Sequence, residues 1–328
     1  MSLELVVSNG MLSTGVRCWT LAFLRTLGFT ATAGVDPKMK AGADAHLALE
    51  HHLQGGTPDE CIRTFLTSYQ PFSEQYVPTA GLMRRLRHEN LSKILDVYLS
   101  LNGLNDVNYS VVATEKQLKL ELYREPGLVV FFTDKSDGIV KMNAESGGGL
   151  QSHEWKTGEY IDDKWFNKYD MDGQITGHVW GSRHAGYDVD GVHVAGIQFN
   201  PLPDLADPKN LKIKGGYRSC AEHKLPLDQC YLSHVKFASR VFTRSAEDIA
   251  QWEKAAIATS MDYYKVLVDG KMRLDGIQFV PQQGLIGGFC NTCEMKPFCQ
   301  SHRLNKNHLM QRPARDAGVI SSGLYENA

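Results

Sequence analysis

Residues Asp134–Lys141 have the sequence DKSDGIVK, and residues His153–Gly158, after a glycine-rich connection, have the sequence HEWKTG. Side chains along a β-strand alternate between its two faces. If the second segment is a strand, Glu154 and Lys156 share one face, while Trp155 points to the opposite face and into the core. The two stretches therefore predict neighbouring antiparallel strands joined by a hairpin.

Short extended segments separated by turn residues surround this pair and predict an antiparallel meander. The predicted strands are Ser110–Val112, Leu118–Tyr123, Leu128–Phe132, Gly138–Met142 and Leu150–Thr157, followed by Val192–Phe199 and Asp228–Phe242. Helical patterns cover Ser8–Gly28, Asp36–Gln54, Pro58–Leu104, Asp170–Arg183 and Ser245–Leu267. This order of helices, strands, helix and further strands predicts an α/β or α+β fold.

Length and composition indicate an ordinary globular chain of 328 residues, 42% hydrophobic and 22% charged. We expect one domain, with a helical part (1–105), a sheet core (106–270) and a cysteine-containing segment (271–328). The net charge of −2 excludes a global basic field, so contacts to nucleic acid require local clusters of lysine and arginine. The sequence contains neither a long apolar run nor a signal-peptide pattern, so we expect an intracellular, cytoplasmic protein without membrane contact.

The carboxylates of Asp137 and Glu154 and the amine of Lys156 suit phosphodiester hydrolysis if the hairpin brings them together. Two carboxylates can hold a hard cation such as Mg²⁺, which lowers the pKa of bound water and offsets charge on the phosphate. The lysine can orient the water or stabilise the transition state. In the alternative interpretation, Asp137 caps a turn, and Glu154 and Lys156 form an ion pair on the surface.

With two further stretches, these residues resemble the RecB-type branch of the PD-(D/E)XK nucleases, whose core has an Asp, apolar residues and then Glu/Asp-x-Lys-Thr-Gly. Gly42–His46 (GADAH) looks like the family's upstream helix motif, whose histidine is an additional metal ligand. Gln174, followed by Ile175, resembles the downstream Gln-apolar-x-x-Tyr motif that lines the active site. His178 stands at the Tyr position, which departs from the family's pattern.

The resemblance implies a restriction-endonuclease-like core, in which helices flank a central mixed sheet. It implies hydrolysis of DNA at ends or single strands that depends on Mg²⁺ or Mn²⁺, and we expect an exonuclease. His46, Asp137 and Glu154 would bind the metal, Lys156 would be catalytic, and Gln174 would position the substrate or Lys156. A role in DNA recombination, repair or viral DNA processing follows by analogy only.

Three of the seven cysteines, Cys290, Cys293 and Cys299, have the spacing C-x₂-C-x₅-C, which suits one soft metal centre. A zinc ion or a 4Fe–4S cluster needs a fourth ligand, from Cys18, Cys61, Cys220 or Cys230. In the cluster-bearing branch of the family, which includes AddB and the CRISPR-associated adaptation nucleases, one cysteine lies on the first helix. The resemblance therefore implies Cys18 and a 4Fe–4S cluster that joins the two ends, with Cys61 as the rival ligand and Zn²⁺ as the alternative metal.

Local basic clusters and aromatic residues are candidates for contacts with DNA, although each could instead be a solvated face or part of the core. The candidates are Arg84, Arg85 and Arg87; Lys209, Lys212, Lys214 and Arg218; Arg303, Lys306, Arg312 and Arg315; and Tyr169, His178, Trp180 and Tyr187. A recombination or replication protein is a candidate partner. The sequence does not predict the oligomeric state. Two rival hypotheses are a catalytically weak DNA-binding protein with a structural cluster and an interaction module without affinity for DNA.

Overall fold

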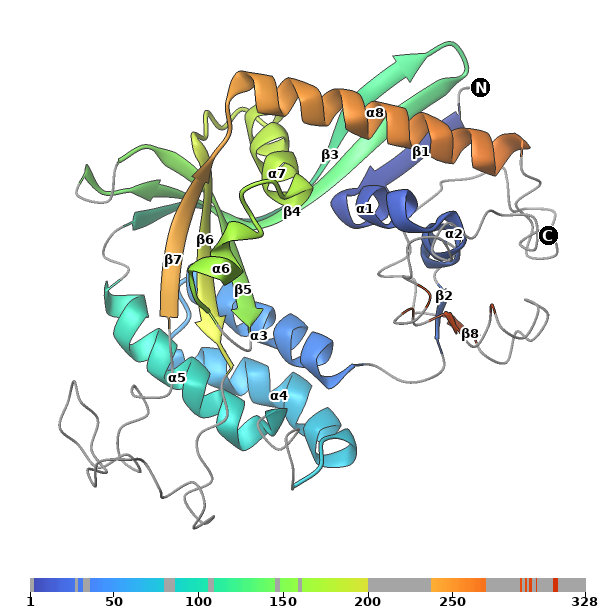
Figure 1. Ribbon diagram of the computed structural model, residues 1–328. Helices are drawn as coiled ribbons and strands as arrows, with labels where there is room; N and C mark the ends of the chain where they lie inside the picture. Colours follow the sequence, from blue (N-terminus) through green and yellow to red (C-terminus); the bar gives the residue numbers. More distant parts are fainter. Residues whose placement is uncertain are drawn as a thin grey trace.

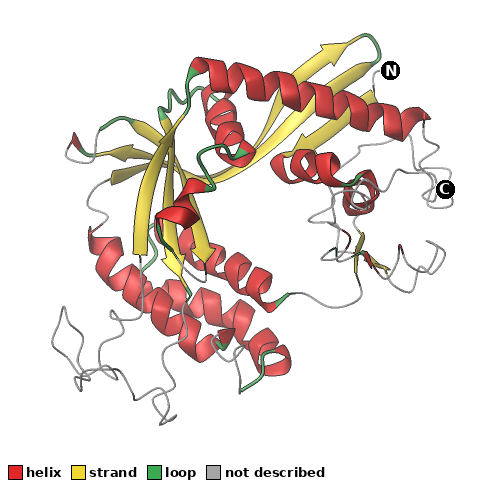
Figure 2. Ribbon diagram, viewed as in Figure 1, coloured by secondary structure: helices red, strands yellow, loops and turns green. Residues whose placement is uncertain are grey.

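The computed structural model describes residues 3–26, 29–31, 36–79, 86–105, 109–144, 148–158, 161–199, 237–269, 290, 293, 295, 296, 299 and 309–311. Within these residues the protein is a mixed α/β structure, and helices flank a six-stranded mixed sheet (Figures 1 and 2). The predicted fold class is therefore confirmed. No helix in the described part of the chain combines the length and apolarity that crossing a membrane requires.

The strands of the main sheet are β1 (Leu3–Ser8), β3 (Tyr109–Glu125), β4 (Leu128–Met142), β5 (Leu150–Gly158), β6 (Gly191–Gln198) and β7 (Phe237–Thr243). A separate two-stranded sheet consists of β2 (Phe29–Ala31) and β8 (Leu309–Gln311). The helices are α1 (Asn9–Arg17), α2 (Trp19–Thr26), α3 (Pro37–Leu53), α4 (Pro58–Tyr76), α5 (His88–Asn105), α6 (Asp163–Asn167), α7 (Gly173–His184) and α8 (Ala246–Asp269).

Strand β4 is the centre of the sheet and has different neighbours on its two edges. Antiparallel β3 covers one edge along nearly the whole strand. The other edge is shared, because parallel β1 pairs with residues 128–133 and antiparallel β5 pairs with residues 138–141. Residues 134–137 therefore have a strand partner on one edge only.

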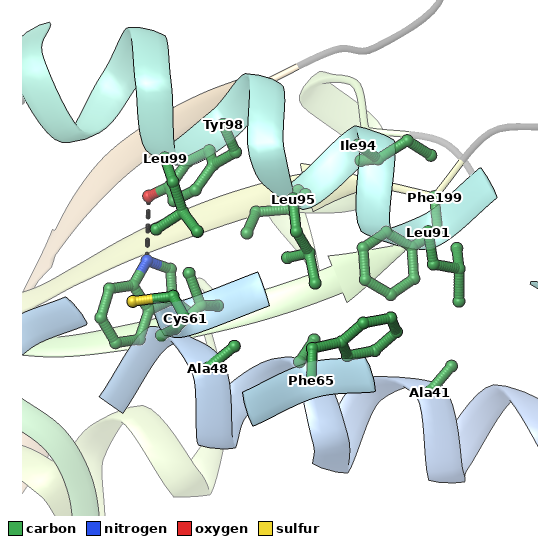
Figure 3. Packing of buried hydrophobic residues seen from close by; sticks show 14 of the residues in the cluster. Ala41, Ala48, Cys61, Phe65, Leu91, Ile94, Leu95, Tyr98, Leu99 and Phe199 are labelled. Carbon is green, nitrogen blue, oxygen red and sulfur yellow. Dashed lines mark hydrogen bonds between the residues drawn. The ribbon is translucent and has the colours of Figure 1, made fainter. Parts of the chain in front are cut away.

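Helices α3, α4 and α5 form the layer that covers β5 and β6 on one side. Figure 3 shows their buried side chains, among them Ala41, Phe65 and Leu95, packed together. Trp155 of β5 is fully buried in this layer, and its indole N–H donates to Tyr98 Oη of α5 at 2.9 Å. The prediction that Trp155 points into the core is thus confirmed.

A second core lies between β1, β3 and β4 and the helices α2, α7 and α8. Its fully or almost fully buried members include Leu5, Leu24, Phe132 and Trp180. Met295, 1% exposed, belongs to the same core, so the C-terminal segment returns to the N-terminal helices. The antiparallel pairing of β2 with β8 joins the two ends of the chain a second time.

Several predicted boundaries differ from the structure. The helix predicted over Ser8–Gly28 is two helices, interrupted at Cys18, whose backbone is extended (φ −165°, ψ 112°). The stretch before it is a strand of the sheet, so the N-terminal part is not wholly helical. Helices α4 and α5 replace the single stretch Pro58–Leu104, and the short helix α6 was not predicted.

The predicted meander is antiparallel, as expected, but its first four short strands are two long ones. The polar stretch 134–137, which separates two of the predicted strands, continues β4, because β3 pairs with it on the closed edge. The prediction of strand Val192–Phe199 agrees with β6, and Ser245 begins α8 through reciprocal hydrogen bonds with Asp248. Of the strand predicted over Asp228–Phe242, residues 228–236 lie outside the described residues.

His153 and His193 form a buried pair across the parallel strands β5 and β6, with Nδ1 atoms 3.0 Å apart. Burial is the main cause that lowers the pKa of His153 to about 3 and that of His193 to about 4, so both rings are neutral at pH 7. His153 Nε2 is buried without a hydrogen-bond partner. The proton of His153 therefore belongs on Nδ1, because an N–H at Nε2 would be left without an acceptor.

This pair predicts that acid destabilises the fold. An unfolded histidine takes up its proton near pH 6.5, whereas the folded pair resists protonation down to about pH 4, so the unfolded state binds more protons in between. Each histidine should lower the free energy of unfolding by roughly 1.4 kcal/mol per pH unit in that window. Urea titrations at pH 6.5 and 5.0 measure this loss. In His193→Gln the loss should shrink, and an equal loss in both proteins would contradict the interpretation.

Candidate active site

The open stretch of β4 is where the predicted site residues meet. The Asp137 carboxylate accepts a hydrogen bond from His46 Nδ1 of α3, 3.0 Å away, through Oδ1. Its Oδ2 accepts the backbone N–H of Trp155 at 2.7 Å. Trp155 lies beyond the last β4–β5 pair, Gly138 with His153, so a side chain here bridges the two strands after the ladder has ended.

Glu154 and Lys156 of β5 are in direct contact, which confirms that they share a face. Lys156 Nζ lies 2.5 Å from Glu154 Oε1 and 3.1 Å from Gln174 Oε1 of α7. Gln174 Nε2 donates to the same Glu154 oxygen at 3.2 Å. The three side chains thus form a closed triangle, in which the amide of Gln174 fixes both the acid and the lysine.

Helix α3 carries His46 to the site because two contacts set its position. The buried Asp44 carboxylate binds Lys40 Nζ through both oxygens and accepts from Ser68 of α4, which anchors α3 to α4. One turn before His46, a Cβ at Gly42 would lie 3.1 Å from Thr157 Oγ1 of β5, so the absence of a side chain permits this close approach. In the predicted motif Gly42–His46, Gly42 and Asp44 therefore position the helix, and His46 belongs to the site.

Helix α7 lies equally close to the site. Asp172 begins the helix by accepting the N–H of Gln174 at 2.6 Å. A Cβ at Gly177 would lie 2.5 Å from the Asn9 side chain, and one at Gly181 would lie 2.9 Å from Asp134 Oδ2. These glycines bring α7 against α1 and the open edge of β4, which holds Gln174 over Lys156.

The charges at the site stabilise one another. Burial would lower the pKa of Lys156, but the charges of Glu154 and Asp137 outweigh this effect and raise it, so the lysine is an ammonium ion. Burial likewise opposes protonation of His46, yet its hydrogen bond to Asp137 raises the pKa. The same hydrogen bond lowers the pKa of Asp137, although burial acts against this.

Asp134 belongs to none of the sequence motifs, yet its side chain contacts that of His178. The Asp134 Oδ1 and His178 Nδ1 atoms are 2.7 Å apart, and both side chains are almost fully buried. On the other side of the ring, His178 Nε2 lies 3.4 Å from Glu154 Oε2. Burial lowers the pKa of His178, but the charges of Asp134 and Glu154 prevail and raise it to about 9. The one feature of the sequence that could have indicated a role for Asp134 is its position near Asp137 in a polar stretch between apolar strand segments.

The donor atoms at the site have the chemistry that a hard divalent cation requires. Asp137 and Glu154 offer carboxylate oxygens, His46 offers a ring nitrogen, and Glu154 Oε2 is buried without a hydrogen-bond partner. His46 and Asp137 are bonded to each other, however. Within the described part of the chain, no three His, Cys, Asp or Glu side chains form a ready-made group of ligands.

Most of the predicted DNA contacts lie outside the described residues, and four of those that are described have buried or structural positions. Tyr169 is 5% and His178 2% exposed, so the prediction that they contact DNA at the surface is wrong, and Trp180 is likewise buried. Arg87 donates to the carbonyls of Ser73 and Val77 at the end of α4 and pairs with Glu89, so its role is structural. Arg84, Arg85 and the clusters at 209–218 and 303–315 lie outside the described residues.

The described cysteines lie in two different places. Cys293 and Cys299 pack against the core that contains Trp19, the residue next to Cys18. Cys61 is buried in the other core, between α3, α4 and α5 (Figure 3). This location separates Cys61 from Cys293 and Cys299, whereas Cys18 is next to Trp19 of the same core. Cys220 and Cys230 lie outside the described residues.

Comparison with known proteins adds no relative: no family model matches the chain, and none of the curated proteins matches it. The assignment of a function therefore depends on the residues of the site and their arrangement.

We expect glycine-to-alanine substitutions at two positions of α7 to change the free energy of unfolding differently. In Gly181→Ala the new methyl group meets Asp134 Oδ2, and we expect a loss of about 1–3 kcal/mol in the free energy of unfolding. In Gly173→Ala the nearest atom is Trp252 Nε1 at 3.7 Å, an ordinary contact. The better helix propensity of alanine should then leave stability unchanged or raise it by up to about 1 kcal/mol. Urea unfolding of both variants tests this, and equal effects would contradict the proposed close approach.

Proposed function

We propose that the protein is a DNA nuclease that depends on Mg²⁺ or Mn²⁺ and hydrolyses phosphodiester bonds at DNA ends or single strands. The observation that carries the proposal is the convergence of His46, Asp137, Glu154, Lys156 and Gln174 at the open edge of β4. These residues come from α3, β4, β5 and α7. Their arrangement supports the resemblance to PD-(D/E)XK nucleases, which rested on short motifs alone.

Each residue has a distinct task in this proposal. Asp137 and Glu154, with His46, would hold the cation, which supplies Lewis acidity to activate water and offsets charge on the phosphate. Lys156 is held as a cation, so it can stabilise negative charge on the phosphate oxygens. Gln174 keeps Lys156 and Glu154 in register through its amide. The charge and the positions are in place before substrate binds, which reduces the cost of reorganisation.

The proposal predicts that two substitutions abolish cleavage but preserve DNA binding. Glu154→Gln removes a ligand charge, and Lys156→Ala removes the cation, so we expect cleavage rates to fall by at least about 100-fold. The measurement is a time course on end-labelled single- and double-stranded DNA with Mg²⁺ or Mn²⁺, together with a binding titration at several salt concentrations.

Glu121→Gln and Lys141→Ala serve as matched controls, because both side chains are exposed and distant in sequence from the site residues of β5. They should cleave like the wild type. A wild-type protein, loaded with metal, that binds DNA but never cleaves it would favour the alternative of a catalytically weak DNA-binding protein. The absence of a ready-made ligand group among the described residues is the observation that favours this alternative.

We further propose that Cys18, Cys290, Cys293 and Cys299 hold a 4Fe–4S cluster, with Zn²⁺ as the alternative. The proposal is supported by the return of Cys293 and Cys299 to the core beside Trp19. A cluster there would add a covalent link between segments that β2 and β8 already join. Its role would be to stabilise the fold, since closing so long a loop contributes roughly 5 kcal/mol.

The cluster proposal predicts a brown protein with broad absorbance near about 400 nm after anaerobic purification. Cys18→Ser should lose most of the iron, whereas Cys61→Ser should keep it, because Cys61 lies in the other core. Iron and zinc analysis of the three proteins is the measurement. A colourless wild-type protein that contains zinc and no iron would replace the cluster by a zinc site, and equal iron in both variants would exclude Cys18.

A further inference from the structure

Three buried side chains continue inward from the candidate site. Glu154, His178 and Asp134 are 3%, 2% and 3% exposed, and they come from β5, α7 and β4. The imidazole of His178 lies between the two carboxylates, with Nδ1 2.7 Å from Asp134 Oδ1 and Nε2 3.4 Å from Glu154 Oε2. All three are almost fully buried, so the arrangement is internal to the fold.

The contact between His178 and Asp134 is short and well formed, whereas the contact between His178 and Glu154 is longer. Asp134 Oδ2, Glu154 Oε2 and His178 Nε2 are all buried without a hydrogen-bond partner. Glu154 Oε1, by contrast, is fully engaged by Lys156 and Gln174. The two oxygens of Glu154 therefore have different surroundings: Oε1 is hydrogen-bonded, and Oε2 lies 3.4 Å from His178 Nε2.

Rotation of a carboxylate is restrained only if both of its oxygens have defined neighbours. A carboxylate free to turn about its terminal torsion would present Oε2 to Lys156 as readily as Oε1, because this torsion is broad and two-fold. The His178 ring cannot turn to follow such a motion, since Asp134 fixes Nδ1. Gly181 permits this, because any side chain there would displace Asp134.

We propose that Asp134 and His178 form a positioning pair that orients Glu154 for the reaction at Lys156. Asp134 holds the ring through Nδ1, and the ring places Nε2 3.4 Å from the second oxygen of Glu154. The inference rests on the proposed nuclease function for its catalytic consequence. It also assigns a role to the position at which the sequence departs from the tyrosine of the family's motif.

Two substitutions of His178 separate its two contacts. The amide of asparagine can replace Nδ1 and keep the contact with Asp134, whereas the longer glutamine can replace Nε2 and keep the contact with Glu154. If His178 positions Glu154, His178→Gln should retain more of kcat than His178→Asn, by about tenfold, with KM nearly unchanged in both. Stability should follow the opposite order, because the 2.7 Å contact with Asp134 is the stronger one.

Ser182→Ala is the control, since Ser182 is buried one turn further along α7 and its hydroxyl makes no hydrogen bond among the described residues. It should cleave like the wild type. The positioning role is overturned if kcat of the two His178 variants follows their stability. If neither variant folds, the isosteric Asp134→Asn replaces them, and it should lower kcat by about tenfold or more with KM unchanged; unchanged kcat then overturns the proposal.

A second measurement does not require catalysis, so it distinguishes failure of this inference from failure of the proposed function. Urea unfolding of Asp134→Asn, Glu154→Gln and the double variant forms a double-mutant cycle. If the ring connects the two acids, the change in the unfolding constant of the double variant should differ by about fivefold or more from the product of the single changes. The same cycle with Ser182→Ala and Glu154→Gln should be multiplicative. A multiplicative result for Asp134 and Glu154 overturns the inference, whether or not the wild type cleaves DNA.

Discussion

The open edge of β4 is the structural constraint on which the candidate site depends. A strand interior to a sheet normally satisfies the backbone groups on both edges with neighbouring strands. Here β1 and β5 share one edge and leave residues 134–137 between them, while β3 pairs with the same residues on the closed edge. The gap leaves room beside Asp134 and Asp137 of β4 for side chains from α3 and α7.

The buried charges in this gap stabilise one another as a group. A single carboxylate or ammonium ion would be costly to bury, because desolvation opposes its charged form. Asp134, Asp137 and Glu154 are instead matched by Lys156, His46 and His178, whose pKa values are all raised. The balance explains how a polar cluster persists beside two apolar cores. It also implies that replacing one member alters the charge and position of the others.

Close packing of α3 and α7 positions the side chains that these helices contribute to the site. Gly42 on α3 and Gly177 and Gly181 on α7 bring helix backbones to distances that a side chain would prevent. Asp44 ties α3 to α4, and Asp172 begins α7 at the residue before Gly173. The N- and C-terminal parts of the chain meet at two places. Strand β2 pairs with β8, and Met295 packs in the core that contains β1.

The local pattern of the sequence was enough to determine the fold class, the shared face of Glu154 and Lys156, the burial of Trp155 and the start of α8. Each of these follows from a period of two along a strand or from a capping residue, which are properties of a few neighbouring residues. Tertiary structure alone decided strand β1, the continuity of β4 through its polar stretch, the structural role of Arg87, the burial of Tyr169, and the roles of Asp134 and His178. They depend on which strand occupies an edge and which helix lies above it, and residues far apart in the sequence set both.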